Sequence, residues 1–311
     1  MHREFWRLLR AAAEGWWNDR AMSLGASIAF FTVFSLAPML LAAIAVAGLA
    51  FGREAAQGAI VSELGGLVGE KESSILETMI ASASHMEAGI VGTVVGAATF
   101  LVLVTGAVIE LQDDLNIIWK VTPKSYGIRD FIRIRLLSLA VVLGLGFLLL
   151  VSLVIDAGLT AVGSYLESSF SGATAILKLL NAAAAFVIAV LLFAMIFKIL
   201  PDVDLTWRDV WTGALVTGLL FTVGKSAIGW YLGSSNVASS YGAAGSLITI
   251  LLWIYYSSLI LLFGAEFTKA FAQTRGSQVG RPDPGERADP RSGTAPPSAG
   301  TARPVRAGTQ G

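Results

Sequence analysis

Long apolar stretches alternate with shorter polar segments along this chain. A helix needs about 20 apolar residues to cross the roughly 30 Å hydrocarbon core of a bilayer. Six stretches meet this requirement, at approximately residues 26–50, 90–109, 136–155, 179–200, 210–232 and 242–264. The pattern predicts an all-α, polytopic membrane helix bundle with about six transmembrane helices. Pro38 lies within the first stretch, where we expect a kink or a break in the helix.

Positive charge is unevenly divided between the two sides of this predicted topology. Lys and Arg number 18 on the side that would hold both termini and 3 on the opposite side, with Lys225 inside the fifth stretch. Segments rich in Lys and Arg stay in the cytoplasm. We therefore expect both termini to be cytoplasmic. A seventh span would place the two most basic ends on opposite faces.

Three segments flank or interrupt the predicted transmembrane domain, residues 22–272. Residues 1–21 mix tryptophans with charges, which fits an interfacial helix along the cytoplasmic headgroups or a plain helical lead-in to the first span. The 51–89 loop repeats apolar residues at helical spacing, which fits an outer helical cap or a solvated loop. Residues 273–311 are rich in proline and lack aromatic side chains, which predicts a disordered cytoplasmic tail.

Composition supports a membrane location and argues against most catalytic chemistry. Hydrophobic residues make up 55% of the 311-residue chain and charged residues 14%, whereas soluble domains carry about 25% charged residues. The net charge is zero, there is no cysteine, and the two histidines, His2 and His85, lie in different regions. We expect no metal site, no cofactor, no nucleic-acid partner and no enzyme activity. Membrane lipids are the expected partners.

Polar residues near the apolar stretches are the candidates for a transport path, because an ionisable side chain at mid-depth costs at least about 2.5–3.5 kcal/mol. The candidates are Ser35, Pro38, Glu110, Asn116, Lys225, Tyr241 and Glu266. Lys225 either snorkels toward the outer surface or faces an interior cavity. Glu266 is three residues before Lys269, at a spacing that favours an ion pair.

Three aspartates before the fifth stretch have two interpretations. Asp202, Asp204 and Asp209 offer the carboxylate oxygens that hard cations prefer. However, Thr206 and Asp209 form a T-x-x-D pattern at the start of a predicted helix, which resembles a capping box. We favour the cap over a metal site.

Four segments resemble the YihY/BrkB virulence-factor family. They are AMSLGASIAFFTVFSLAPMLL (21–41), LQDDLNIIWKV (111–121), the region from Pro201 through GALVTGLLFTVGKSAIGWYL (213–232), and SSYGAAGSLITILLWIYYSSLILLFGAEFTKA (239–270). The resemblance covers nearly all of residues 1–272 and implies a bacterial inner-membrane protein of about six helices. The family name once included ribonuclease BN, which is regarded as a mistaken attribution. Members are linked to serum resistance and, in some branches, to transport of lipids or lipid precursors.

The sequence leaves several functions open. A transporter or flippase for a lipid or other amphiphile ranks first, because polar residues are distributed over otherwise apolar spans. A non-transporting envelope scaffold, with envelope proteins as partners, ranks second. Ion-coupled exchange through Glu110 and Glu266 ranks third. Ribonuclease activity is disfavoured, because the acidic residues lie at membrane exits and no histidine pair is evident. Substrate, coupling ion and oligomeric state are not fixed by the sequence.

Overall fold

The long helices after the first one each coincide with an apolar stretch of the sequence. The computed structural model describes residues 2–52, 90–121, 173–234 and 245–279, with a few single residues and short helical pieces between 54 and 61 and between 144 and 158. These residues form helices and no strand. The long helices are α1 (His2–Asn18), α2 (Ala21–Phe51), α5 (Ile90–Ile118), α7 (Ala173–Ile199), α8 (Trp207–Ser234) and α10 (Gly245–Thr274). The prediction of an all-α helix bundle is confirmed.

Five of the six predicted spans each overlap one long helix, α2, α5, α7, α8 or α10. Most of the third predicted span, most of the 51–89 loop and all of residues 280–311 lie outside the residues that the structure describes. Three helices in the described part are long and apolar enough to cross a membrane: Leu179–Ile199, Trp207–Tyr231 and Leu247–Thr274. Ala21–Leu36, within α2, is a shorter apolar helix.

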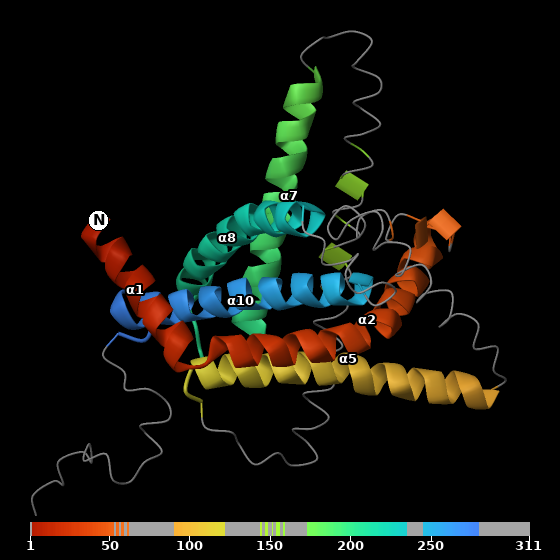
Figure 1. The fold of residues 1–311 in the computed structure, drawn as a ribbon, viewed down its shortest axis with the longest axis horizontal. Coiled ribbons are helices and arrows are strands. Elements are labelled where there is room, and N and C mark those ends of the chain that lie inside the picture. The colour runs from red at the N-terminus through yellow and green to blue at the C-terminus, as the bar shows by residue number, and fades with distance from the viewer. Residues whose placement is uncertain are drawn as a thin grey trace, which may run out of the picture.

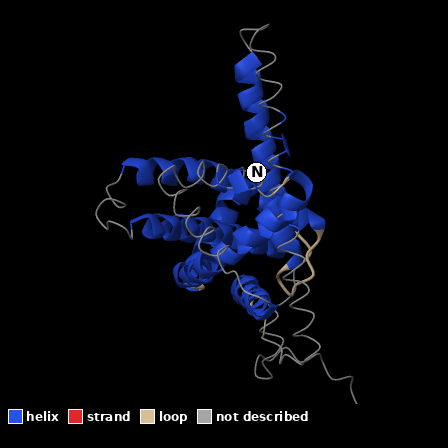
Figure 2. Cartoon of the chain, turned by 90° about the vertical axis from the view of Figure 1, so that its right-hand side faces the viewer, coloured by secondary structure: helices blue, strands red, loops and turns tan. Residues whose placement is uncertain are grey.

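The helix α10 is central to the described bundle. It packs against α1, α2, α5 and α8, while α2 also packs against α5, and α7 packs against α8. Figure 1 shows α2, α5, α8 and α10 running roughly alongside one another, whereas α7 crosses them steeply. The N-terminal half of α7 projects away from the other helices in both views (Figures 1 and 2). Its apolar side chains, such as Leu179 at 72% exposure, therefore lie on the surface, as suits a lipid environment.

The first predicted span forms one continuous helix across Pro38. Figure 1 shows that α2 bends in its second half, the half that follows this proline. A proline inside a helix removes one backbone donor and displaces the preceding turn, which is a common cause of such a bend. The helix ends at Gly52, whose φ of 84° is a conformation that glycine adopts readily.

Close packing joins α8 to α10, because each helix places a glycine opposite a threonine of the other. A Cβ atom on Gly213 would lie 1.8 Å from Thr268 Oγ1, and one on Gly264 would lie 1.9 Å from Thr217 Oγ1. Each threonine donates its hydroxyl to a carbonyl of its own helix, Thr217 to Gly213 at 2.8 Å and Thr268 to Gly264 at 2.7 Å. Small residues of this kind let membrane helices approach at short range. We call this contact the Gly–Thr interface.

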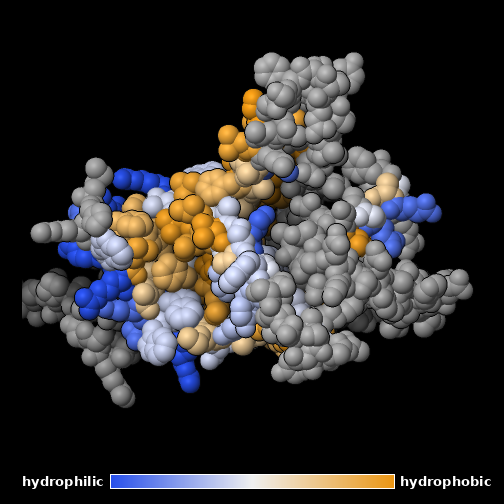
Figure 3. All heavy atoms as spheres, turned by 45° about the horizontal axis from the view of Figure 1, so that its top comes forward, coloured by the Kyte–Doolittle hydropathy of each residue, from blue (hydrophilic) through white to orange (hydrophobic). Residues whose placement is uncertain are grey.

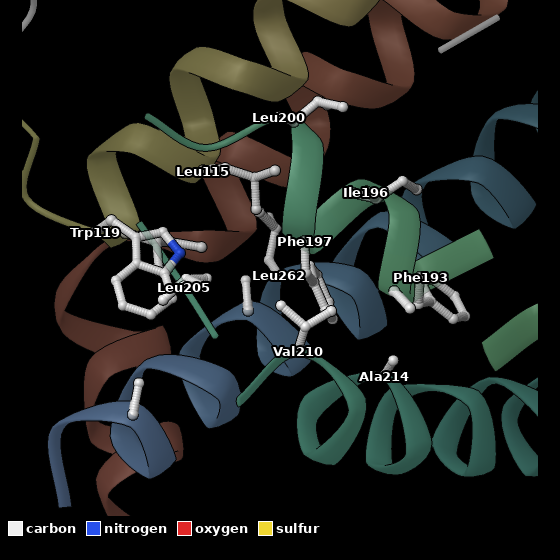
Figure 4. Close-up of a cluster of buried hydrophobic side chains, with 14 of the residues drawn as sticks. Leu115, Trp119, Phe193, Ile196, Phe197, Leu200, Leu205, Val210, Ala214 and Leu262 are labelled. Carbon is white, nitrogen blue, oxygen red and sulfur yellow. The ribbon is translucent and has the colours of Figure 1, made fainter. Parts of the chain in front are cut away.

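A cluster of buried apolar side chains fills the space where α5, α7, α8 and α10 meet (Figure 4). Its members include Leu115, Trp119, Phe193, Phe197, Leu200, Leu205, Val210 and Leu262. Leu205 comes from the short connection between α7 and α8, so this connection is fixed against the end of α5. The cluster thereby sets where the polar residues at this end of the bundle lie.

Polar surface gathers at one end of the molecule. Figure 3 shows hydrophilic side chains at the end that carries α1, next to apolar surface over the middle of the molecule. The same end holds the C-terminal ends of α5 and α10 and the start of α8, including the exposed Arg10, Arg20 and Arg208. We call it the basic end. It is the end that the charge distribution predicts to face the cytoplasm.

Candidate functional site

Four charged side chains, three of them buried, lie together at the basic end, where α1, α5 and α10 meet. They are Asp19, Lys120, Glu266 and Lys269, and we call them the charge cluster. Lys269 Nζ lies 3.9 Å from Asp19 Oδ2 and 3.9 Å from Glu266 Oε2, and Lys120 Nζ contacts Asp19 Oδ1. The side chains of Asp19 and Glu266 are only 6% and 3% exposed. The predicted pair of Glu266 with Lys269 is therefore present, within a larger group.

The helix α1 covers this cluster with its backbone. A Cβ atom on Gly15 would lie 2.4 Å from Glu266 Oε2, so a larger residue there would require the Glu266 side chain to move. The neighbouring Trp16 donates its indole N–H to the Leu259 carbonyl at 3.4 Å, and Ala12 is fully buried. The buried face of α1 thus packs on α10.

The opposite side of α1 carries exposed tryptophans and arginines. Trp6 and Trp17 are 59% and 70% exposed, and Arg7 and Arg10 are exposed beside them. A turn at Arg20 separates α1 from α2, so the two do not form one continuous helix. Exposed tryptophans next to arginines are typical of a membrane interface, so the prediction of an interfacial helix remains consistent with the arrangement.

Two turns at the basic end each contain a non-glycine residue in the left-handed backbone region. Arg20 has φ 57° and Lys120 has φ 54°. This region costs such residues roughly 1–2 kcal/mol, and glycine is the usual residue at the end of a helix. The Lys120 side chain, which makes the conformation unfavourable, is also the one that pairs with Asp19. Strain of this kind is concentrated at functional sites.

Two of the predicted candidates connect helices elsewhere in the bundle. Asn116 donates to Asp202 Oδ2 at 3.1 Å and accepts the Asp202 backbone N–H at 2.9 Å, and Gln112 also donates to this carboxylate at 3.4 Å. These bonds join the end of α5 to the α7–α8 connection. Glu110 accepts a hydrogen bond from Ser27 Oγ and so joins α5 to α2.

The start of α8 has the side-chain bonds expected of a cap. Asp209 Oδ2 accepts the Thr206 hydroxyl at 2.7 Å and the Thr206 backbone N–H at 3.3 Å. It also accepts the Ser277 backbone N–H at 3.2 Å, which attaches the segment after α10 to α8. No group of three or more His, Asp or Glu side chains suited to a metal ion occurs among the described residues. These bonds favour the cap as the role of Asp209.

Among the described residues, Lys225 and Glu266 do not meet in one cavity. Lys225 lies on the exposed side of α8, roughly 12 Å along the helix axis from Thr217, which is opposite Gly264. It is therefore well separated from Glu266. Ser35 is buried, and its hydroxyl donates to the Thr32 carbonyl at 3.1 Å. Pro38 lies in α2, and Tyr241 lies outside the described residues.

A groove of about 280 Å³ lies between α2, α7, α8 and α10 and is not fully enclosed. Three hydroxyl groups line it, those of Thr32, Ser257 and Ser258. The rest of its lining is apolar: Ala189, Leu192, Phe193, Phe221, Trp253, Ile254 and Leu261. Among the described residues, no charged side chain lines it. Its volume is close to the lower limit of about 300 Å³ for small-molecule pockets. A groove of this size and polarity suits a hydrocarbon chain rather than a charged group.

Asp114 is another buried carboxyl group near the basic end, beyond the predicted span 90–109. It is 3% exposed, and its Oδ2 atom has no hydrogen-bond partner among the described residues. Burial raises the pKa of Asp114 to about 7, and the negative charges of Glu110 and Asp113 add to the effect. Asp114 therefore titrates near neutral pH.

Sequence reasoning did not identify Asp19, Lys120, Gly15 or the groove. The partners Asp19 and Lys120 are 101 positions apart in the chain, so no local spacing connects them. The groove residues are apolar, like those that face lipid, so hydropathy does not separate the two. A weak signal existed for Lys120, which follows the polar run 110–116 at the end of an apolar stretch.

Comparisons with known proteins give one consistent result. A family model described as virulence factor BrkB matches residues 12–290. A UPF0761 membrane protein of Rhodospirillum centenum is 27% identical over 284 residues, covering 88% of this chain and 59% of that protein. One from Ralstonia nicotianae is 30% identical over 267 residues, covering 83% and 56%. One from Tolumonas auensis is 24% identical over 279 residues, covering 86% and 84%.

The chain spans about three-fifths of the length of the first of these relatives. No solved structure matches the chain. All three relatives are named as membrane proteins, in agreement with the apolar helices of the bundle.

Proposed function

The chain belongs to the virulence factor BrkB family, and from this premise we propose that it moves a lipid or another amphiphile between the leaflets of the bacterial inner membrane, as a multi-pass protein. The observation that carries the proposal is the groove of about 280 Å³ between α2, α7, α8 and α10. The groove lies near the middle of these helices, where lipid tails are found.

The lining of the groove fits one part of an amphiphile. The aromatic rings of Phe193, Phe221 and Trp253 offer apolar contacts to a hydrocarbon tail. The hydroxyls of Thr32 and Ser257 add limited polarity without the cost of a buried charge. A tail held here leaves its headgroup nearer the ends of the bundle, where the charged residues lie. This division of tail and headgroup supports an amphiphile as the substrate class.

Filling the groove tests the proposal. In liposomes that contain the purified protein and a fluorescent phospholipid, we expect Ala189→Trp to reduce movement between leaflets to the rate of protein-free liposomes. Ala189 lines the groove on α7, so the added indole occupies the space of the tail. Movement is measured by adding an impermeant quencher that reaches only the outer leaflet.

The matched control for this variant lies on the same helix. Ala183 is exposed on α7 and does not line the groove, so Ala183→Trp should keep the wild-type rate. Wild-type protein that moves no lipid faster than empty liposomes would overturn the proposed function. Equal rates for wild type and Ala189→Trp would remove the groove from the path.

The proposal includes no enzymatic role for the chain. RNA cleavage usually calls for clustered metal-binding carboxylates or a histidine acid–base pair, and the only histidines are His2 and His85. Purified protein that cleaves RNA would contradict this part of the proposal. A scaffold role would depend on the 51–89 loop, which lies almost entirely outside the described residues.

A further inference from the structure

Two buried carboxyl groups of the charge cluster share one cation. Lys269 Nζ lies 3.9 Å from Asp19 Oδ2 and 3.9 Å from Glu266 Oε2. Asp19 Oδ2 and Glu266 Oε1 are both buried and have no hydrogen-bond partner among the described residues. Both distances from Lys269 Nζ are beyond hydrogen-bonding distance. The cluster thus holds two groups that, when ionised, are both acceptors.

A hydrogen bond between two carboxyl groups requires a proton on one of them. Without that proton, the two lysines balance the two negative charges, yet Asp19 Oδ2 and Glu266 Oε1 remain buried acceptors with no hydrogen bond among the described residues. With the proton, one carboxyl donates to the other and both acceptors gain a partner. Pairs of carboxyl groups that share one proton for this reason are well documented in proteins.

Glu266 is the member that has less compensation for its charge. The charges that face it are Asp19 at the α1–α2 turn, Lys120 at the end of α5 and Lys269 on its own helix. Lys120 contacts Asp19 directly, so this cation is already paired. The side of Glu266 toward α1 is occupied by the Gly15 backbone, where a Cβ would lie 2.4 Å from Oε2. The proton is therefore best placed on Glu266.

We propose that Glu266 and Asp19 form a proton-binding site beneath α1, in which the Glu266 carboxyl donates a hydrogen bond to the Asp19 carboxylate. The Lys120 side chain is 41% exposed and marks the side from which water of the basic end reaches the cluster. The proton is taken from and returned to this water. Its release leaves two carboxylates side by side in the contact between α1 and α10 with no hydrogen bond between them, which loosens α1. Any effect on lipid movement rests on the proposed function, whereas proton binding itself does not.

Infrared spectroscopy of the full chain in detergent tests proton binding without any transport measurement. Because Asp114 also titrates near neutral pH, the comparison is made in an Asp114→Asn background, where at neutral pH we expect a carboxylic-acid C=O band that Glu266→Gln removes. Glutamine keeps the hydrogen bond to Asp19 through its amide N–H, so this variant should remain folded. Glu14→Gln is the control, because Glu14 is an exposed α1 residue paired with Arg10, and it should leave the band unchanged. An unchanged band in a folded Glu266→Gln protein would overturn the proposal.

The position of α1 gives a second readout. Because the chain has no cysteine, spin labels attach only at cysteines introduced at the exposed Ala13 and Thr274. We expect the distance distribution between them to broaden as the pH rises from mildly acidic to mildly alkaline. The same labels in the Glu266→Gln background should give a narrow distribution at every pH. A pH response that persists in Glu266→Gln would contradict the assignment.

Discussion

The two contacts that α10 makes along its length differ in what holds them together. Against α8, the Gly–Thr interface brings two backbones close through Gly213, Thr217, Gly264 and Thr268, and each hydroxyl is satisfied within its own helix. Against α1 and α5, the charge cluster relies on buried ions whose partners come from three segments. The first contact needs only shape, whereas the second needs a particular protonation state and charge balance.

This difference suggests how one helix serves stability and response together. The stability of a close-packed interface without ionisable groups does not depend on pH. Its van der Waals contacts are lost as soon as the helices separate. A buried charge cluster changes its free energy whenever one member gains or loses a proton. The α8 side of α10 is therefore expected to stay fixed, and the α1 side is expected to be the part that responds.

The largest effect is expected from adding one carbon to the Gly–Thr interface. The Cβ of Gly264→Ala would lie 1.9 Å from Thr217 Oγ1, so the helices must separate. We expect a loss of about 1–3 kcal/mol of stability, as for other overpacked contacts, visible as a lower thermal midpoint in detergent. Combining it with Thr217→Ala removes the closest atom and should recover part of the loss.

Gly229 provides the control for this prediction, because a Cβ there meets no atom within 4 Å. Gly229→Ala should be neutral or stabilising by up to about 1 kcal/mol, since alanine favours helix more than glycine. If Gly264→Ala and Gly229→Ala have the same midpoint, the Gly–Thr interface is not the rigid side of α10.

A smaller effect separates backbone strain from ion pairing in the charge cluster. Lys120→Ala removes the partner of Asp19 but keeps a Cβ at φ 54°. Lys120→Gly removes the same partner and also relieves the left-handed strain. We therefore expect both variants to be less stable than the wild type, with glycine more stable than alanine by about 1 kcal/mol. Thermal unfolding of the three proteins measures this, and equal midpoints for the two variants would show that the turn is not strained.

The smallest effect concerns Asp114, a buried carboxyl outside the cluster. Its pKa is raised from 3.8 to about 7 by burial, then by Glu110 and Asp113. A carboxyl with a raised folded-state pKa contributes its stability fully below the unfolded value and loses it as the pH rises through about 7. The wild-type midpoint should therefore fall by a few degrees across this range, and Asp114→Asn should flatten the fall.

The exposed Asp204 provides the comparison for this pH dependence. Asp204→Asn should keep the wild-type slope of thermal midpoint against pH, because the Asp204 side chain is exposed to water and its replacement changes no buried group. If Asp114→Asn also keeps that slope, burial at this position does not perturb the titration.

Hydropathy predicted the helices well but not the partners of their polar residues. Apolar runs located α2, α5, α7, α8 and α10, because a bilayer requires about 20 apolar residues per crossing. The i, i+3 spacing of Glu266 and Lys269 correctly indicated an ion pair. The candidate list left open whether Lys225 and Glu266 share a cavity, and in the structure the two lie at different levels of the bundle with Lys225 exposed.

The sequence by itself determined that this chain is a membrane helix bundle, which end of it is basic and which family it belongs to. These properties can be read from composition and from the order of residues along the chain, because these determine whether each segment prefers lipid or water. Only the tertiary structure decided that Asp19, Lys120 and Glu266 meet and that four helices enclose a groove. Lipid-facing and interior side chains are equally apolar, so the choice between them depends on how helices far apart in the chain pack.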